Sequence, residues 1–242
     1  MSHFQGKDPV AHVIEKQAEG ITALSESHGT EMPGHLSAGA DAAREMGVYL
    51  LILWTLLSVF NAPTFLILTT FGIGFLAWKT GRSAQLGWAR LERLHRLIEQ
   101  ERCEIENNRP EEREELTALY AAKGFEGKLL KDVIDVLMSD NDRLLKIMLE
   151  EELGLTLQVY EHPLKQCLGA LVGGLFAFLV SAFFYLLIPL YGMLIATVII
   201  VSISAGVAAV YEKNQVLSAI IWNLAIAGVA FGITYYTLHA LI

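Results

Sequence analysis

The sequence predicts an all-α membrane protein with five transmembrane helices and a cytosolic helical insert between the second and the third. Three observations support this prediction. The chain of 242 residues is 53% hydrophobic with a mean hydropathy of +0.43, which is more apolar than an ordinary soluble domain. Its apolar residues gather in long runs, close to the ~20 residues that cross a bilayer. Between those runs lies a polar stretch in which apolar residues recur at helical spacing.

The runs divide the chain into four segments. We expect a polar N-terminal segment over 1–46, a transmembrane hairpin over 47–80, an acidic helical domain over 81–161 and a block of three transmembrane helices over 162–242. The N-terminal segment shows no early apolar core, so no cleavable signal peptide is expected. Ser37 is expected to cap a helix that begins at residue 38 and continues into the membrane.

The hairpin consists of apolar runs over 47–60 and 64–78, separated by the helix-breaking Asn61-Ala62-Pro63. Each run is shorter than the ~20 residues that a crossing requires. The first run can gain length from 38–46 and the second from 79–85. A re-entrant hairpin that does not reach the far side of the membrane is the alternative.

The insert is predicted to hold four helices. A long helix over 80–107 ends before Pro110, because proline disfavours helix at the preceding residue. Pro110 begins a second helix, which ends before Gly124. The third helix covers 126–138. The fourth covers 141–153 and is capped by Ser139 or Asp140.

The final block is predicted to span the membrane three times, over 164–187, 190–210 and 216–241. Gly169, Gly173 and Gly174 give the first of these helices a small-residue face for close helix contact. Basic residues near span ends lie in the N-terminal segment, the insert and the 211–215 turn. This distribution predicts that the N-terminus and the insert face the cytosol. The membrane itself is expected to be a bacterial inner membrane or an endomembrane.

Several function classes are excluded by composition and motifs. The net charge of -8 and the lack of a basic stripe argue against nucleic-acid binding. Cys103 and Cys167 lie in very different settings, so a disulfide is not expected. Glu92 and His95 have the ExxH spacing of half a di-iron site. Because this motif occurs once, we interpret it as a structural helix face and predict that the protein is not an enzyme.

Carboxylates recur at helical spacing in the insert, as Glu101 with Glu104, Glu112 with Glu115, and a run over 150–152. Residues three apart share a helix face, so each pair can point at one partner. If the helices pack together, the pairs could converge on a hard or borderline divalent cation. The alternative is a solvated acidic face with pairs along one helix.

A weaker metal candidate lies in the N-terminal segment, where His28, Glu31 and His35 are close in sequence. Imidazole and carboxylate groups together suit a transition metal. The alternative is a Gly- and Pro-rich loop whose histidines are solvated or cap a helix.

Three stretches resemble the vacuolar iron transporter family of iron and manganese transporters: RPEEREELTALYAAKGF, LLKIMLEEELGL and HPLKQCLGALVGGLFAFLVSAFFYLLIPL. The resemblance covers about residues 92–242. It implies a cytosolic insert whose glutamates collect divalent metal, and a pathway between the spans of a homodimer. The implied metal ligands are Glu101, Glu104, Glu112, Glu115, Met148 and Glu152. A soft thioether beside carboxylates would suit Fe²⁺ better than Mg²⁺ or Ca²⁺.

The first hairpin departs from the family, which typically has an aspartate in the first helix and a methionine in the second. Residues 47–78 contain no Asp, Glu, His, Lys, Arg or Met. Asp41 lies near the register of the aspartate, with Glu45 one turn on, and the two are candidates for a pathway mouth. Lys79 falls near the methionine position, where its charge should repel a divalent ion.

Two functions therefore remain open. The first is a transporter that moves Fe²⁺ or Mn²⁺ out of the cytosol, which the insert and the last three spans favour. The second is a membrane-anchored metal-binding or sensing protein without transport, which the first hairpin favours. In either case the expected partners are divalent metal ions, the lipid bilayer and a second copy of the chain, with no organic cofactor.

Overall fold

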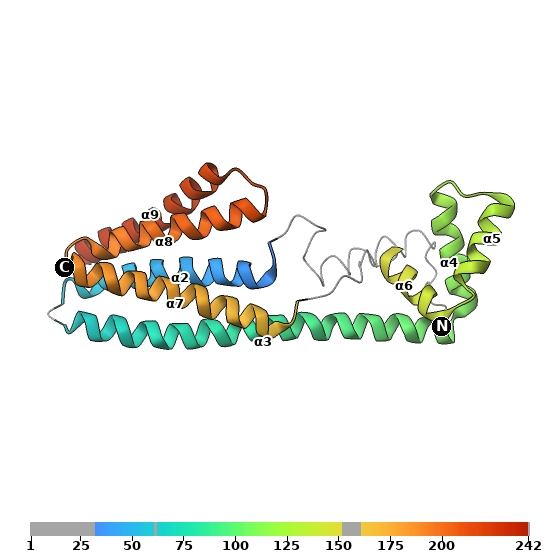
Figure 1. Cartoon of the computed structure of the whole chain (residues 1–242), viewed down its shortest axis with the longest axis horizontal. Coiled ribbons are helices and arrows are strands. Elements are labelled where there is room, and N and C mark those ends of the chain that lie inside the picture. The colour runs from blue at the N-terminus through green and yellow to red at the C-terminus, as the bar shows by residue number, and fades with distance from the viewer. Residues whose placement is uncertain (1–31, 61, 152–160, 242) are drawn as a thin grey trace. The chain divides into compact units, whose positions relative to one another are not determined.

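The computed structural model describes residues 32–60, 62–151 and 161–241, and all regular structure in these ranges is helical (Figure 1). The described residues form two compact units. The membrane unit comprises 32–60, 62–88 and 161–241, and the acidic unit comprises 89–151. The predicted all-α class is confirmed for these parts of the chain.

Helix α2 covers Gly34–Leu57, and Pro33 rather than Ser37 occupies its N-cap position, so the expected cap is wrong. The physical reason is a carboxylate from a distant part of the chain. Glu161 Oε2 accepts a hydrogen bond from the His35 backbone N–H at 2.8 Å, which satisfies a donor at the start of the helix. The early start makes α2 long enough, at roughly 36 Å, to cross about 30 Å of hydrocarbon.

Helix α3 covers Thr64–Asn107 without a break, so the second hairpin helix and the first insert helix are one element. Its residues up to 88 belong to the membrane unit and its later residues to the acidic unit. Gly87 allows α3 to approach the start of α7 closely. A Cβ atom there would lie 2.9 Å from Gln166 Oε1 and 3.0 Å from the Pro163 Cα.

The other helices of the acidic unit lie near their predicted positions: α4 covers Arg109–Ala122, α5 covers Gly127–Leu137 and α6 covers Asn141–Glu151. Asp140 caps α6, because its Oδ1 accepts the Arg143 backbone N–H at 2.8 Å. All four helices contribute to one apolar core, which includes Leu94, Ile105, Leu116, Ile134, Leu144 and Met148. The apolar stripes predicted from the sequence therefore pack the helices together.

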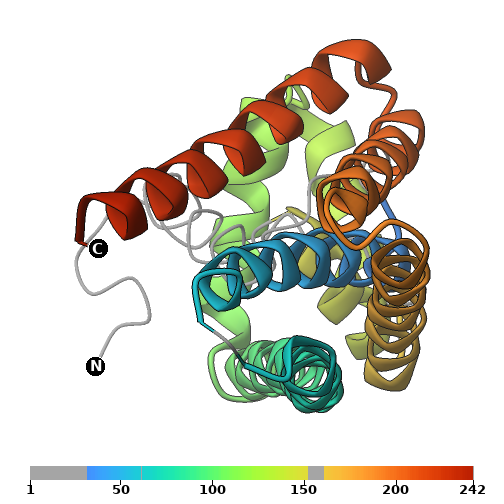
Figure 2. The same ribbon diagram turned by 90° about the vertical axis from the view of Figure 1, so that its left-hand side faces the viewer.

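The membrane unit places α2 among its other helices, which are α3, α7 (Pro163–Leu187), α8 (Gly192–Tyr211) and α9 (Val216–Leu241). Helix α2 contacts α7, α8 and α9, and it shares an apolar core with α3 through Leu50 and Leu68. Figure 2 shows α2 (blue) in the middle of this group. Helix α2 is thus surrounded by other helices of the unit on several sides.

The glycine face predicted on α7 packs against α2. A Cβ atom at Gly169 would collide with the His35 carbonyl oxygen, and one at Gly173 would collide with the Gly39 carbonyl oxygen. A Cβ atom at Gly39 would in turn lie 2.9 Å from the Gly169 carbonyl oxygen. The two backbones therefore approach as closely as small-residue helix pairs do in membranes.

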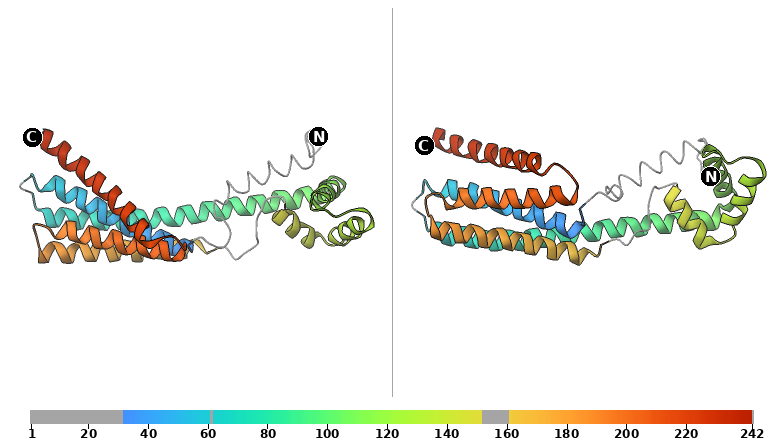
Figure 3. Two further views of the ribbon diagram at one scale, coloured as in Figure 1. Left: turned by 90° about the horizontal axis from the view of Figure 1, so that it is seen from above. Right: turned by 45° about the horizontal axis from the view of Figure 1, so that its top comes forward.

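Within the described parts of the chain, four helices are long and apolar enough to cross a membrane: α3, α7, α8 and α9. Helix α9 lies at the edge of the membrane unit, and Ala227 is its one buried residue among those described (Figure 3). Helix α2 is not among them, because any 18 consecutive residues of this helix include the three charged residues Asp41, Arg44 and Glu45. Whether α2 forms the fifth predicted span therefore depends on how these three charges are neutralised.

Candidate functional site

Three carboxylates predicted to bind metal are buried in the acidic unit. Glu101 on α3 is 2% exposed, and Glu112 and Glu115 on α4 are 0% exposed. Glu101 lies one turn before Ile105 and Glu112 lies one turn before Leu116, so these two glutamates share helix faces with core residues. Glutamate is rarely buried to this extent. The solvated acidic face is therefore not the structure found for these three residues.

The remaining predicted ligands differ in their surroundings. Met148 on α6 is fully buried in the core that contains Ile105 and Leu116. Leu149, at the position where the family can show a second methionine, is 1% exposed and packs in the same core. Glu104 is half-buried. Glu152 lies outside the described residues.

Burial of several negative charges in one small unit is costly unless positive charge or protons compensate it. In the described ranges, no three His, Cys, Asp or Glu side chains already have the arrangement of a metal-ion site. The acidic unit thus concentrates buried carboxylates beside a buried thioether without holding them in a finished coordination geometry. At the edge of the unit, burial raises the pKa of Tyr120, and the Glu151 carboxylate acts in the same direction.

The two carboxylates predicted to form a pathway mouth are each paired with a cation of the same chain. Glu45 Oε1 accepts a hydrogen bond from Lys79 Nζ on α3 at 2.6 Å. Asp41 is paired with Arg44 Nη2 on the same helix. Arg44 Nη1 also donates to Asn223 Oδ1 on α9 at 3.0 Å. Lys79 was expected near the position of the family's methionine, and its bond to Glu45 was not predicted.

Arg44 and Asn223 were not predicted to take part in this network. The spacing of Asp41 and Arg44, three residues apart on a helix, was a signal for the first pair. No local pattern indicates the bond from Arg44 to Asn223, because it joins residues that are 179 positions apart in the chain.

His35, from the weaker N-terminal candidate, is within hydrogen-bonding distance of Glu161 Oε1 through its Nδ1 atom. The same carboxylate accepts the His35 backbone N–H, so it joins the start of α2 to the residues before α7. His28 and Glu31 lie outside the described residues. His35 therefore has a partner, Glu161, that was not predicted from the sequence.

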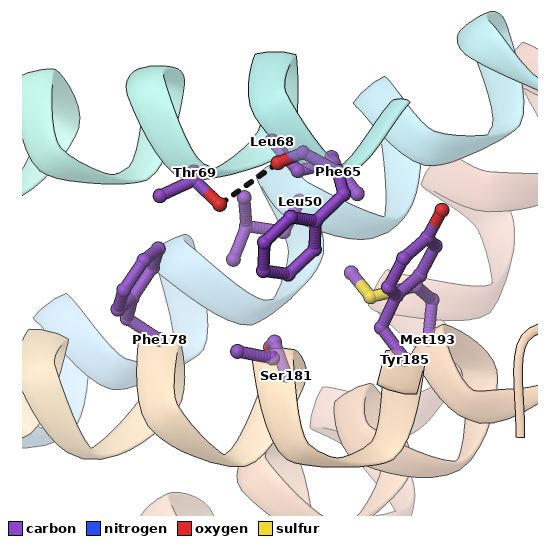
Figure 4. A pocket seen from close by; sticks show the side chains of 9 residues that line it. Leu50, Phe65, Leu68, Thr69, Phe178, Ser181, Tyr185 and Met193 are labelled. Atoms are coloured by element: carbon purple, nitrogen blue, oxygen red, sulfur yellow. Dashed lines mark hydrogen bonds between the residues drawn. The ribbon is translucent and has the colours of Figure 1, made fainter. Parts of the chain in front are cut away.

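Two other features do not form a metal site. Glu92 and His95 are both exposed on α3, which agrees with their interpretation as a helix face. A cavity of about 20 Å³ lies between α2, α3, α7 and α8, lined by Leu50, Phe65, Leu68, Thr69, Phe178, Ser181, Ala182, Tyr185 and Met193 (Figure 4). It has room for about one water molecule, and its lining is mostly apolar.

Residues 88–239, more than half of the chain, match the sequence model of the family described as VIT family. The chain belongs to the VIT family. The resemblance to vacuolar iron transporters is thereby confirmed. A search of curated proteins found no match.

Membership of the VIT family places the protein among membrane transporters of metal ions rather than enzymes. The match includes the acidic unit and helices α7, α8 and most of α9. It does not include α2 or the first part of α3, where Asp41, Glu45 and Lys79 lie. The pair of Glu45 with Lys79 and the pair of Asp41 with Arg44 therefore lie outside the matched residues.

Proposed function

We propose that this VIT-family protein moves divalent metal, Fe²⁺ or Mn²⁺, out of the cytosol across a membrane, and that its acidic unit collects the metal. The observation that carries the proposal is the burial of Glu101, Glu112 and Glu115 in a unit whose core contains Met148. Carboxylate oxygens suit divalent cations, and a thioether favours Fe²⁺ over Mg²⁺ or Ca²⁺.

In this proposal the incoming metal draws the glutamate side chains and Glu152 into a shared coordination shell. Its positive charge compensates the carboxylates that the fold keeps away from water. The N-terminus and the acidic unit face the cytosol, as the placement of basic residues predicts. Helix α2 provides the fifth span, and a second copy of the chain completes a homodimer. Protons moving in the opposite direction would supply the driving force.

The experiment that tests the proposal is metal uptake by proteoliposomes containing the full chain, with Fe²⁺ and Mn²⁺ measured separately. The matched variants are Glu112→Gln and Glu114→Gln, since both residues lie on α4 but Glu114 is exposed. We expect uptake by the wild type and by the Glu114 variant, and reduced uptake by the Glu112 variant. Uptake no faster than in protein-free liposomes would refute transport.

A second function is favoured by the charge pairs in the membrane unit. If Lys79 holds Glu45 permanently, the protein binds or senses metal without moving it. The result expected from that function is metal binding that depends on Glu112, together with no flux of either metal.

A further inference from the structure

The ion pair between Glu45 and Lys79 is partly exposed on the membrane unit, with the Lys79 side chain 19% exposed and the Glu45 side chain 41% exposed. Glu45 is near the middle of α2, roughly 17 Å from each end at about 1.5 Å per residue. Lys79 is roughly 22 Å from the start of α3 by the same measure. Both distances place the pair within about 30 Å of hydrocarbon if the hairpin spans the membrane. Ionisable side chains at such depth are costly and mark functional positions.

The pair also lies on a face of α2 where the next carboxylate is one turn away. Asp41 and Glu45 are four residues apart, so they share a helix face. Each has a cation of the chain as its partner, Arg44 for Asp41 and Lys79 for Glu45. A metal ion that moves along this face would meet two carboxylates that are already neutralised.

The two cations differ in how firmly they are held. Arg44 has partners on two helices, Asp41 on α2 and Asn223 on α9. Lys79 is 19% exposed, and its only bond in the described structure is to Glu45. The ammonium group of lysine is a compact point charge on a flexible stem, so it can leave one partner without moving the backbone. Lys79 is therefore the displaceable cation of the network.

We infer that Lys79 is a specificity-determining residue of the transport pathway, a tethered monovalent cation that a divalent ion displaces from Glu45. The inference rests on the proposed transport function. Coulomb attraction to the two carboxylates is proportional to the charge of the ion. A divalent ion gains more at this face than the lysine ammonium loses, whereas Na⁺ or K⁺ carries no more charge than the group it must replace. The pair thus selects divalent over monovalent ions. It also lowers the apparent affinity of the pathway for the transported metal, because the metal must displace Lys79.

The first test compares Lys79→Gln with Arg82→Gln, which removes a charge from an exposed position one turn further along α3. Both are made in a chain that also carries Glu112→Gln and Glu115→Gln, so that binding by the acidic unit does not mask the result. We expect Mn²⁺ binding by the full chain to become at least ~10-fold tighter, about 1.4 kcal/mol, with Lys79→Gln and not with Arg82→Gln. Equal affinity in the two would overturn the inference.

Proteoliposome flux then separates this inference from the proposed function. With the acidic unit intact, Lys79→Gln is expected to admit Na⁺ or K⁺, which the wild type and Lys79→Arg exclude. Wild-type Mn²⁺ flux together with unchanged ion selectivity in Lys79→Gln would overturn the role of Lys79 but leave transport standing. No flux in the wild type would refute transport and with it the pathway role of Lys79, while the binding comparison would still show whether a divalent ion competes with Lys79 for Glu45.

A measurement on the wild-type chain covers the case in which Lys79→Gln does not fold. A membrane-permeant amine reagent labels lysines, and mass spectrometry reports the labelling rate of each one. We expect Mn²⁺ to raise the labelling of Lys79, because displacement from Glu45 exposes the amine, while Na⁺ at the same ionic strength does not. Labelling of Lys79 that is the same with both ions would show that the pair is fixed, and would overturn the inference.

Discussion

Glu112→Gln removes one charge from the buried face of α4 and keeps the size and shape of the side chain. The residue is 0% exposed and one turn from Glu115, which is also 0% exposed. If these groups bind metal, the substitution removes a ligand without opening a cavity. Its effect should therefore appear in metal binding, and in stability when metal is present. Glu114→Gln makes the same charge change at an exposed position of the same helix.

The magnitude follows from linkage between binding and folding. Loss of a group that merely supports a metal ligand weakens binding about 10–100-fold, and loss of the ligand itself should reach at least the upper value. Metal at about 100 times its dissociation constant stabilises the wild type by about 2.7 kcal/mol. A variant that binds ~100-fold more weakly would keep only about 0.4 kcal/mol of this stabilisation at the same metal concentration.

The assay is equilibrium dialysis of the full chain against Mn²⁺, followed by thermal unfolding with and without metal, monitored by circular dichroism. Fluorescence would be less suitable, because all four tryptophans lie outside the acidic unit. We expect the wild type and Glu114→Gln to share one affinity and one metal-induced stabilisation. If Glu112→Gln shows that same affinity, the buried carboxylates are structural and Glu112 is not a metal ligand.

Three further outcomes are expected. Gly173→Ala should destabilise the membrane unit by about 1–3 kcal/mol, because its Cβ would meet the backbone of α2. The measurement is the unfolding midpoint in detergent. Gly228→Ala, whose Cβ would meet nothing within 4 Å, should change this midpoint far less. Glu161→Ala should cost about 1 kcal/mol through lost capping of α2, and an unchanged midpoint would contradict that capping role. The pKa of Tyr120 is raised in the folded state, so the unfolded state loses the phenol proton first and stability should fall above about pH 10. Tyr120→Phe should reduce this fall in stability. An ultraviolet titration in which Tyr120 behaves as an ordinary tyrosine would refute the predicted pH dependence.

Much of the acidic unit could be predicted from the sequence because its signals are local. Pro110 and Asp140 mark helix starts through backbone chemistry that acts within a few residues. The three-residue spacing of Glu112 and Glu115 places them on one face whatever the helix packs against. Spacing alone left open whether that face was solvated or buried. The packing of α3, α4, α5 and α6 around one core decided that it is buried.

The sequence by itself determined the all-helical class, the long apolar helices and the family, because these depend on composition, on helical periodicity and on stretches of consecutive residues. Only the tertiary structure decided how the charges of the membrane unit are neutralised. Glu45 and Lys79 lie 34 positions apart, and His35 and Glu161 lie 126 positions apart. Such pairs form because a low-dielectric interior penalises an uncompensated charge, and the fold brings a distant partner within reach. The penalty can be inferred from a sequence, but the identity of the partner depends on how the helices pack.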